Sequence, residues 1–134
     1  MNMKHNMLAK RTIITFTIAL VSLGLQAQNA NVVNAYNHMK SGELTEAAGY
    51  IDQAILDAKT GANEKTWRYR GDIYRLIVQD STLATQYPEA MERAIESYLK
   101  AVELDTKESY RTENVQALGA LQGMFVGPVL AGGS

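Results

Sequence analysis

The 134-residue sequence contains no cysteine, two prolines, two phenylalanines and two histidines. The absence of cysteine excludes disulfide frameworks, thiolate metal sites, thiol nucleophiles and a lipid-bearing cysteine. Beyond the N-terminal segment His38 is the sole histidine, so the sequence predicts no metal site, no cofactor and no catalytic residue. With 46% hydrophobic and 20% charged residues, the composition is typical of one small globular unit and not of a disordered chain.

Long apolar runs are also scarce, and the clearest one lies near the N-terminus. Three cations come first, at Lys4, Lys10 and Arg11. Residues 13–25 then carry no charge, and small and polar residues follow. This order is typical of a secretory signal peptide, and the run is shorter than the roughly 20 apolar residues that span a bilayer. We therefore expect residues 1–27 to be cleaved after Ala27, with Ala30 as a second candidate and an uncleaved anchor as the alternative.

Cleavage would change the charge of the chain. Removing residues 1–27 takes away three cations and no anion, which leaves ten Lys and Arg residues against fourteen Asp and Glu residues, a net charge of about −4. A charge of this sign argues against nucleic acid as a partner. Export of a chain without cysteine indicates a bacterial periplasm or cell surface, since secreted domains of eukaryotes often rely on disulfides.

From residue 31 onward the apolar residues follow helical spacing, and the predicted fold class is all-α. We expect helices over about 31–40, 43–58, 64–79, 88–105 and 108–125, with a loop at 80–88 and a flexible tail at 127–134. Gly42 is placed to end the first helix, Asn63 to cap the third and Pro88 to open the fourth.

The same spacing predicts the buried side chains. In the second helix these are Leu44, Ala47, Ala48, Ile51, Ala54, Ile55 and Ala58. In the fourth and fifth helices they are Met91, Ala94, Ile95, Tyr98, Leu99, Ala101, Val102, Val115, Leu118, Leu121, Met124 and Phe125.

The most distinctive stretch is "TWRYRGDIYRL", residues 66–76. Trp67, Gly71 and Tyr74 fit the repeat pattern W-x2-L-G-x2-Y, with Arg70 in the place of leucine. The second half of that pattern, A-x3-F, is met by Ala94 and Tyr98, with Ala101 after them. In a hairpin, small residues at such positions let two helices approach closely while large ones fill the space around them.

A weaker copy of this pattern precedes it. Ala35 corresponds to Gly71 at a separation of 36 residues, close to the expected period of about 34. Gly42 makes the turn, and Ala47, Ile51 and Ala54 correspond to Ala94, Tyr98 and Ala101. Over residues 31–106 the chain resembles a tetratricopeptide repeat (TPR) protein of the exported bacterial kind. The resemblance implies antiparallel hairpins stacked as a short right-handed solenoid, with an 11-residue insertion in the second hairpin.

Two other interpretations of this stretch fail on helical geometry. The Arg70-Gly71-Asp72 triplet would have to be exposed on a loop to serve as an adhesion motif, but here it lies inside a predicted helix. Interleaved aromatic and cationic residues can stack bases, but adjacent residues of a helix point in different directions. The stretch is therefore predicted to be mainly a packing face.

The resemblance also implies a binding groove, because in this family the first helix of each hairpin lines the concave surface. The residues that this places in the groove are Tyr36, Met39, Lys65, Arg68, Asp72 and Arg75. We expect them to bind a peptide or partner protein that carries an acidic group near the arginines and an apolar group near Tyr36 and Met39. Solvated surface side chains are the alternative interpretation.

The leading functional hypothesis is a noncatalytic interaction module, a scaffold in the periplasm or at the cell surface. No charged residue occurs from Asn114 to Ser134, although a terminal helix of a solenoid needs a polar outer face. Two alternatives follow from this. The chain is an N-terminal accessory fragment of a larger envelope, carbohydrate-uptake or enzymatic protein truncated at Ser134, or it is a structural protein that self-associates through the fifth helix.

Overall fold

The computed structural model describes residues 29–131, with side chains for residues 29–124. Throughout the described range the secondary structure is helical and contains no strand, which confirms the all-α prediction. Helix α1 is described over residues 29–40. It is followed by α2 (Leu44–Ala54), α3 (Glu64–Gln79), α4 (Ser81–Gln86), α5 (Ala90–Leu104) and α6 (Arg111–Ala131). The predicted signal peptide and its cleavage site after Ala27 lie in residues 1–28, outside this range, whereas the second candidate, Ala30, lies within α1.

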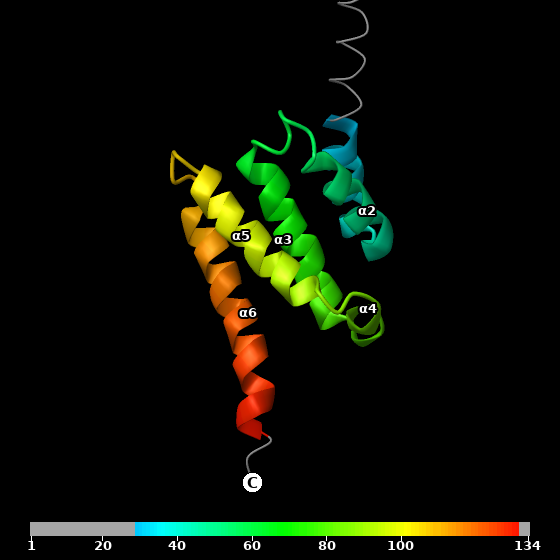
Figure 1. Cartoon of the computed structure of the whole chain (residues 1–134), viewed down its shortest axis with the longest axis vertical. Coiled ribbons are helices and arrows are strands. Elements are labelled where there is room, and N and C mark those ends of the chain that lie inside the picture. Colours follow the sequence, from blue (N-terminus) through cyan, green and yellow to red (C-terminus); the bar gives the residue numbers. More distant parts are fainter. Residues whose placement is uncertain (1–28, 132–134) are drawn as a thin grey trace, which may run out of the picture.

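The longer helices lie side by side in the order α2, α3, α5 and α6, and α4 lies at one end of the α3–α5 pair (Figure 1). The most extensive packing is between α3 and α5, and smaller interfaces join α2 to α3 and α5 to α6. One core cluster runs through these interfaces. It contains Ala35, Ile51, Tyr74, Tyr98 and Leu121, which come from five different helices.

The turn between α1 and α2 depends on Gly42, as the sequence predicts. Its φ is +79°, a left-handed conformation that glycine adopts without steric cost. The Gly42 amide donates to the Met39 carbonyl at 3.1 Å, and the Glu43 amide donates to the His38 carbonyl at 2.9 Å. These bonds satisfy the last carbonyls of α1 and reverse the chain direction.

Helix α2 ends at Ala54, four residues before the predicted end at Ala58. Side chains of the following turn compete for the backbone groups there. The Thr60 hydroxyl donates to the Ala54 carbonyl at 2.6 Å, and the Asp57 carboxylate accepts from the Lys59 and Thr60 amides at 2.9 Å. Such local hydrogen bonds replace the next helical turn, so Ala58 is exposed.

The predicted loop at 80–88 is wrong in part, because its centre forms the short helix α4. The Asp80 carboxylate accepts from the Thr82 and Leu83 amides at 3.0 Å and caps that helix. Asn63 caps α3 in the same way, by accepting from the Lys65 amide. Pro88 lies before α5, which begins at Ala90, and not within its first turn.

The last helix differs from its prediction at both ends. It starts at Arg111 because Glu108 has a left-handed φ of 54° and because the Asp105 carboxylate accepts from the Ser109 and Tyr110 amides. It continues to Ala131, where the sequence predicts a flexible tail from residue 127.

The small residues predicted at helix contacts are buried. They are Ala35, Ala47, Ala54, Gly71, Ala94 and Ala101. A Cβ atom on Gly71 would lie 2.7 Å from the Tyr98 ring, so this glycine is required by the close approach of α3 to α5. Trp67 is only partly buried, and its indole nitrogen donates to the Gly61 carbonyl at 2.7 Å.

Besides Ala58, three residues predicted to be buried are exposed. The exposed fractions are 38% for Ile95, 56% for Leu99 and 52% for Val115. They line a groove between α5 and α6 that no other described helix covers. Helical spacing identifies apolar residues but does not reveal whether a neighbouring helix is present to bury them. The side chain of Phe125 lies outside the described side chains.

Candidate functional site

Helices α1 and α3 bring together the residues predicted to line a groove. Tyr36 of α1 lies against Tyr69 of α3, with ring centroids 4.9 Å apart. One turn further along both helices, Met39 and Asp72 line the same hollow. The two helices therefore run in the same direction here, and the positions that lie next to each other are 33 residues apart. This is the relation expected between the first helices of successive repeats of about 34 residues.

Cationic and aromatic side chains alternate across this surface. The Arg68 guanidinium lies 5.3 Å from the centroid of Tyr69 and 4.6 Å from that of Tyr110, and the Lys65 ammonium lies 5.5 Å from Tyr69. Cations at such distances from a ring are attracted to its electron-rich face. We call this group, Tyr36, Lys65, Arg68, Tyr69 and Tyr110, the aromatic–cation surface.

A hollow of about 290 Å³ adjoins the aromatic–cation surface. Its lining residues are Met39, Lys40, Asp72, Arg75 and Leu76. The Tyr98 hydroxyl donates to Asp72 Oδ1 at 2.6 Å and accepts from Arg75 Nε at 3.2 Å. Burial, followed by the bond to Asp72, raises the pKa of Tyr98, which therefore stays neutral at physiological pH. The hydroxyl of Tyr98, a buried residue of α5, thus holds Asp72 and Arg75 in place.

All six predicted groove residues lie on this side of the molecule, in two adjacent groups. Tyr36, Lys65 and Arg68 belong to the aromatic–cation surface, and Met39, Asp72 and Arg75 belong to the hollow. Tyr69 and Tyr110, which contact the cations, are not among the predicted groove residues. Tyr69 could have been found from its helical position next to Lys65 and Arg68, whereas Tyr110 is brought in by the turn before α6, which has no sequence signature.

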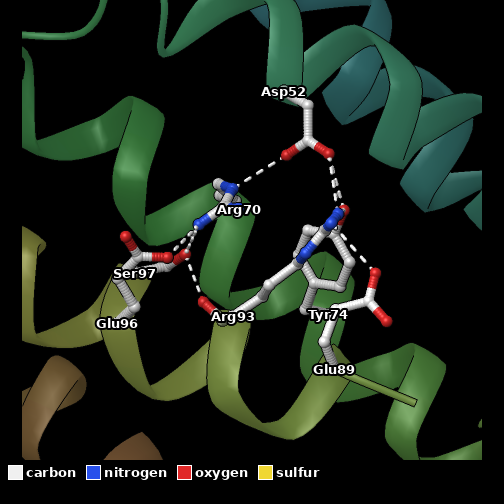
Figure 2. A network of polar contacts seen from close by, with 7 residues as sticks. All are labelled: Asp52, Arg70, Tyr74, Glu89, Arg93, Glu96 and Ser97. Atoms are coloured by element: carbon white, nitrogen blue, oxygen red, sulfur yellow. Dashed lines mark hydrogen bonds and ion pairs between the residues drawn. The ribbon is translucent and has the colours of Figure 1, made fainter. Parts of the chain in front are cut away.

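A second polar cluster lies between α2, α3 and α5, and Figure 2 shows it. Its members are Asp52, Arg70, Tyr74, Glu89, Arg93, Glu96 and Ser97, here called the Arg70 network. Arg70 is buried, with a side-chain exposure of 7%. Its Nε donates to Asp52 Oδ1 at 2.8 Å. Its Nη1 donates to Glu96 Oε2 at 3.0 Å and to Ser97 Oγ at 2.9 Å. The arginine that replaces the leucine of the repeat pattern thus connects the two hairpins.

Asp52 is the centre of this network. Its Oδ2 accepts from the Tyr74 hydroxyl at 2.6 Å and from Arg93 Nη1 at 3.2 Å. Arg93 Nη1 also donates to the Tyr74 oxygen at 2.6 Å. Burial, followed by the bond to Asp52, raises the pKa of Tyr74 to about 12. With every charge paired and the phenol neutral, the network is suited to fixing how the hairpins pack.

His38 stacks on Tyr50 with ring centroids 5.3 Å apart, and its Nδ1 lies 2.6 Å from Glu43 Oε2. Among residues 29–131, no group of three or more His, Asp or Glu side chains is arranged to hold a metal ion. None of the helices in that part of the chain is long and apolar enough to cross a bilayer.

Comparisons with family models, curated proteins and solved structures gave no significant match to this chain. Over residues 29–131 the protein is all-helical, with α1 parallel to α3 and the aromatic–cation surface across them.

Proposed function

We propose that the protein is a noncatalytic, TPR-like scaffold of the periplasm or cell surface that binds a peptide or partner protein across α1 and α3. The observation that carries this proposal is the continuous contact from Tyr36 through Tyr69 to Arg68 and Tyr110. It joins α1, α3 and the start of α6 in one partly exposed surface. Tyr and Arg are among the residues enriched where proteins bind one another tightly.

The chemistry of the surface indicates the chemistry of its ligand. Lys65, Arg68 and Arg75 supply positive charge, and Arg68 uses only its Nε for hydrogen bonding within residues 29–124, to Glu64 at 3.2 Å. A carboxylate of the ligand is therefore expected next to Arg68 and Arg75. An apolar side chain of the ligand is expected to contact Tyr36 and Met39, whose own side chains are uncharged. The parallel arrangement of α1 and α3 supports the TPR-like part of the proposal.

A double charge reversal tests this surface. We expect Arg68→Glu/Arg75→Glu to lose partner proteins that the wild type captures from periplasmic extract, with recovery reduced by about tenfold or more, since an acidic ligand would now be repelled. Recovery is measured by quantitative mass spectrometry of the bound fraction. Thermal melting is measured in parallel because Arg75 also bonds Tyr98.

The matched control is Lys100→Glu/Lys107→Glu, which makes the same change in net charge on α5 and the turn after it. We expect this variant to retain the captured proteins. Equal recovery by the wild type and by Arg68→Glu/Arg75→Glu, with both folded, would contradict the proposed function.

Export is a separate part of the proposal and rests on the order of residues 1–27. We expect the chain isolated from the periplasmic fraction to begin at Gln28, because the apolar segment is too short to anchor it and the small residue Ala27 precedes the expected cut. Intact mass and N-terminal sequencing check this. A chain that keeps residues 1–27 and sediments with the inner membrane would show that export and cleavage were wrongly proposed.

A further inference from the structure

An apolar groove lies between α5 and α6, and it shares no residue with the aromatic–cation surface and only Glu96 with the Arg70 network. Its volume is about 1030 Å³. The lining residues are Pro88, Met91, Glu92, Ile95, Glu96, Leu99, Val115, Leu118, Gly119, Leu121 and Gln122. Leu99, Val115 and Ile95 are among the most exposed large apolar side chains in the described part of the chain. A contiguous apolar surface of this kind indicates an interaction site.

Helix α6 carries two different apolar faces. Asn114, Ala117, Leu121 and Met124 are buried or half-buried, and of these Ala117, Leu121 and Met124 pack with the core. Val115, Leu118, Gly119 and Gln122, at i, i+3, i+4 and i+7, form a second stripe that lines the groove. A helix that is apolar on more than one face is normally buried on more than one face. The intramolecular contacts of α6 cover the first face and, on the second, only half-buried Leu118.

The glycines of α6 have no explanation within one chain. Gly119 and Gly123 lie one turn apart on the exposed side, and a Cβ atom on either would meet nothing within 4 Å. Glycine inside a helix costs about 1 kcal/mol relative to alanine. At Gly71 the close approach of Tyr98 explains that cost, but around Gly119 and Gly123 the space is open. Paired glycines four residues apart allow another helix backbone to come close.

We propose that the groove is filled by α6 of a second copy of this chain, in a two-fold symmetric dimer. In such a dimer the stripe of each α6 packs against that of its partner, close to Gly119, and enters the groove beside the partner's α5. The same residues serve as ligand and as site, which is the requirement for a self-complementary two-fold interface. This inference rests on the groove and is independent of the proposed ligand-binding surface on α1 and α3.

Charge favours a second copy as the occupant. The only charged lining residues are Glu92 and Glu96, both from α5, and Glu96 is already paired with Arg70. The floor of the groove is apolar and would accept a helix without charges. Helix α6 begins with the charged residues Arg111 and Glu113, but from Asn114 to its end at Ala131 it contains no charged residue.

The test measures the mass of the purified protein, expressed from its full sequence, by size-exclusion chromatography with light scattering over a concentration series. We expect the wild type to have the mass of two chains in the micromolar range. Gly119→Leu should weaken this association by about tenfold or more, because the leucine overpacks the helix contact. Within one chain the space around Gly119 is open, so the substitution should not lower the melting temperature of the monomer.

Gly49→Leu is the matched control. Gly49 is an exposed glycine of α2 with nothing within 4 Å of an added Cβ, and it lies outside the groove. The Gly49→Leu variant should therefore keep the mass of two chains. Because the chain has no cysteine, Gln122→Cys offers a second readout: oxidation should link two chains, whereas Gln53→Cys on α2 should not.

A wild type with the mass of one chain at all concentrations would overturn the proposal and leave the groove to another protein or another segment. A dimer that Gly119→Leu weakens no more than Gly49→Leu does would overturn it as well, since the two copies would then meet elsewhere.

Discussion

Replacing Asp52 with alanine is expected to lower the free energy of unfolding by about 3 kcal/mol. The substitution removes the carboxylate that pairs with buried Arg70 at 2.8 Å and also accepts from Tyr74 and Arg93. A buried guanidinium left with fewer partners retains most of its desolvation cost. This loss lies at the lower end of the range expected when one partner of a buried ion pair is removed, because 31% of the Asp52 side chain is exposed. Chemical denaturation followed by circular dichroism measures it.

Two further variants separate the ion pair from simple loss of packing. Glu96 pairs with Arg70 from an exposed position, at 61% exposure, so Glu96→Ala should cost less than about 1 kcal/mol. Arg70→Leu introduces the leucine of the repeat pattern and removes the buried charge. The double variant Asp52→Ala/Arg70→Leu should therefore be more stable than Asp52→Ala alone by about 1 kcal/mol or more. If adding Arg70→Leu makes Asp52→Ala less stable, the network does not act through charge pairing.

Gly71→Ala is expected to destabilise the protein by about 1–3 kcal/mol, although alanine is the better helix former. The added methyl group would lie 2.7 Å from the Tyr98 ring. That ring cannot easily move away, because it is buried and its hydroxyl is bonded to Asp72 and Arg75. Leucine at this position should cost more. Thermal melting and denaturant titration measure the change.

The control for Gly71→Ala is the same substitution at Gly49. Nothing lies within 4 Å of a Cβ atom there, so only the gain in helix propensity remains, and we expect stability to rise by about 0.5–1 kcal/mol. The two substitutions are chemically identical and should have opposite signs. Unchanged melting of Gly71→Ala would show that α3 and α5 do not approach as closely as the structure places them.

The sequence by itself determined the fold class and most of the helices. Helical spacing of apolar residues requires only local backbone geometry, so α3 was predicted with both of its ends, and the turn at Gly42 followed from the conformational freedom of glycine. The small residues at helix contacts were also predictable, since the repeat pattern places them at fixed positions. The TPR-like identity stays a prediction, as does export.

The tertiary structure decided which faces are covered and which polar groups meet. The Arg70 network joins Asp52, Arg70 and Arg93, which are separated by 18 and 23 positions, and no local pattern encodes such pairing. Tyr110 joins Arg68 through a turn whose shape depends on Asp105. Ile95, Leu99 and Val115 have the spacing of core residues and are exposed because no further described helix lies beside α5 and α6. The sequence determines which side chains gain from burial, whereas the arrangement of neighbouring helices determines which of them are buried.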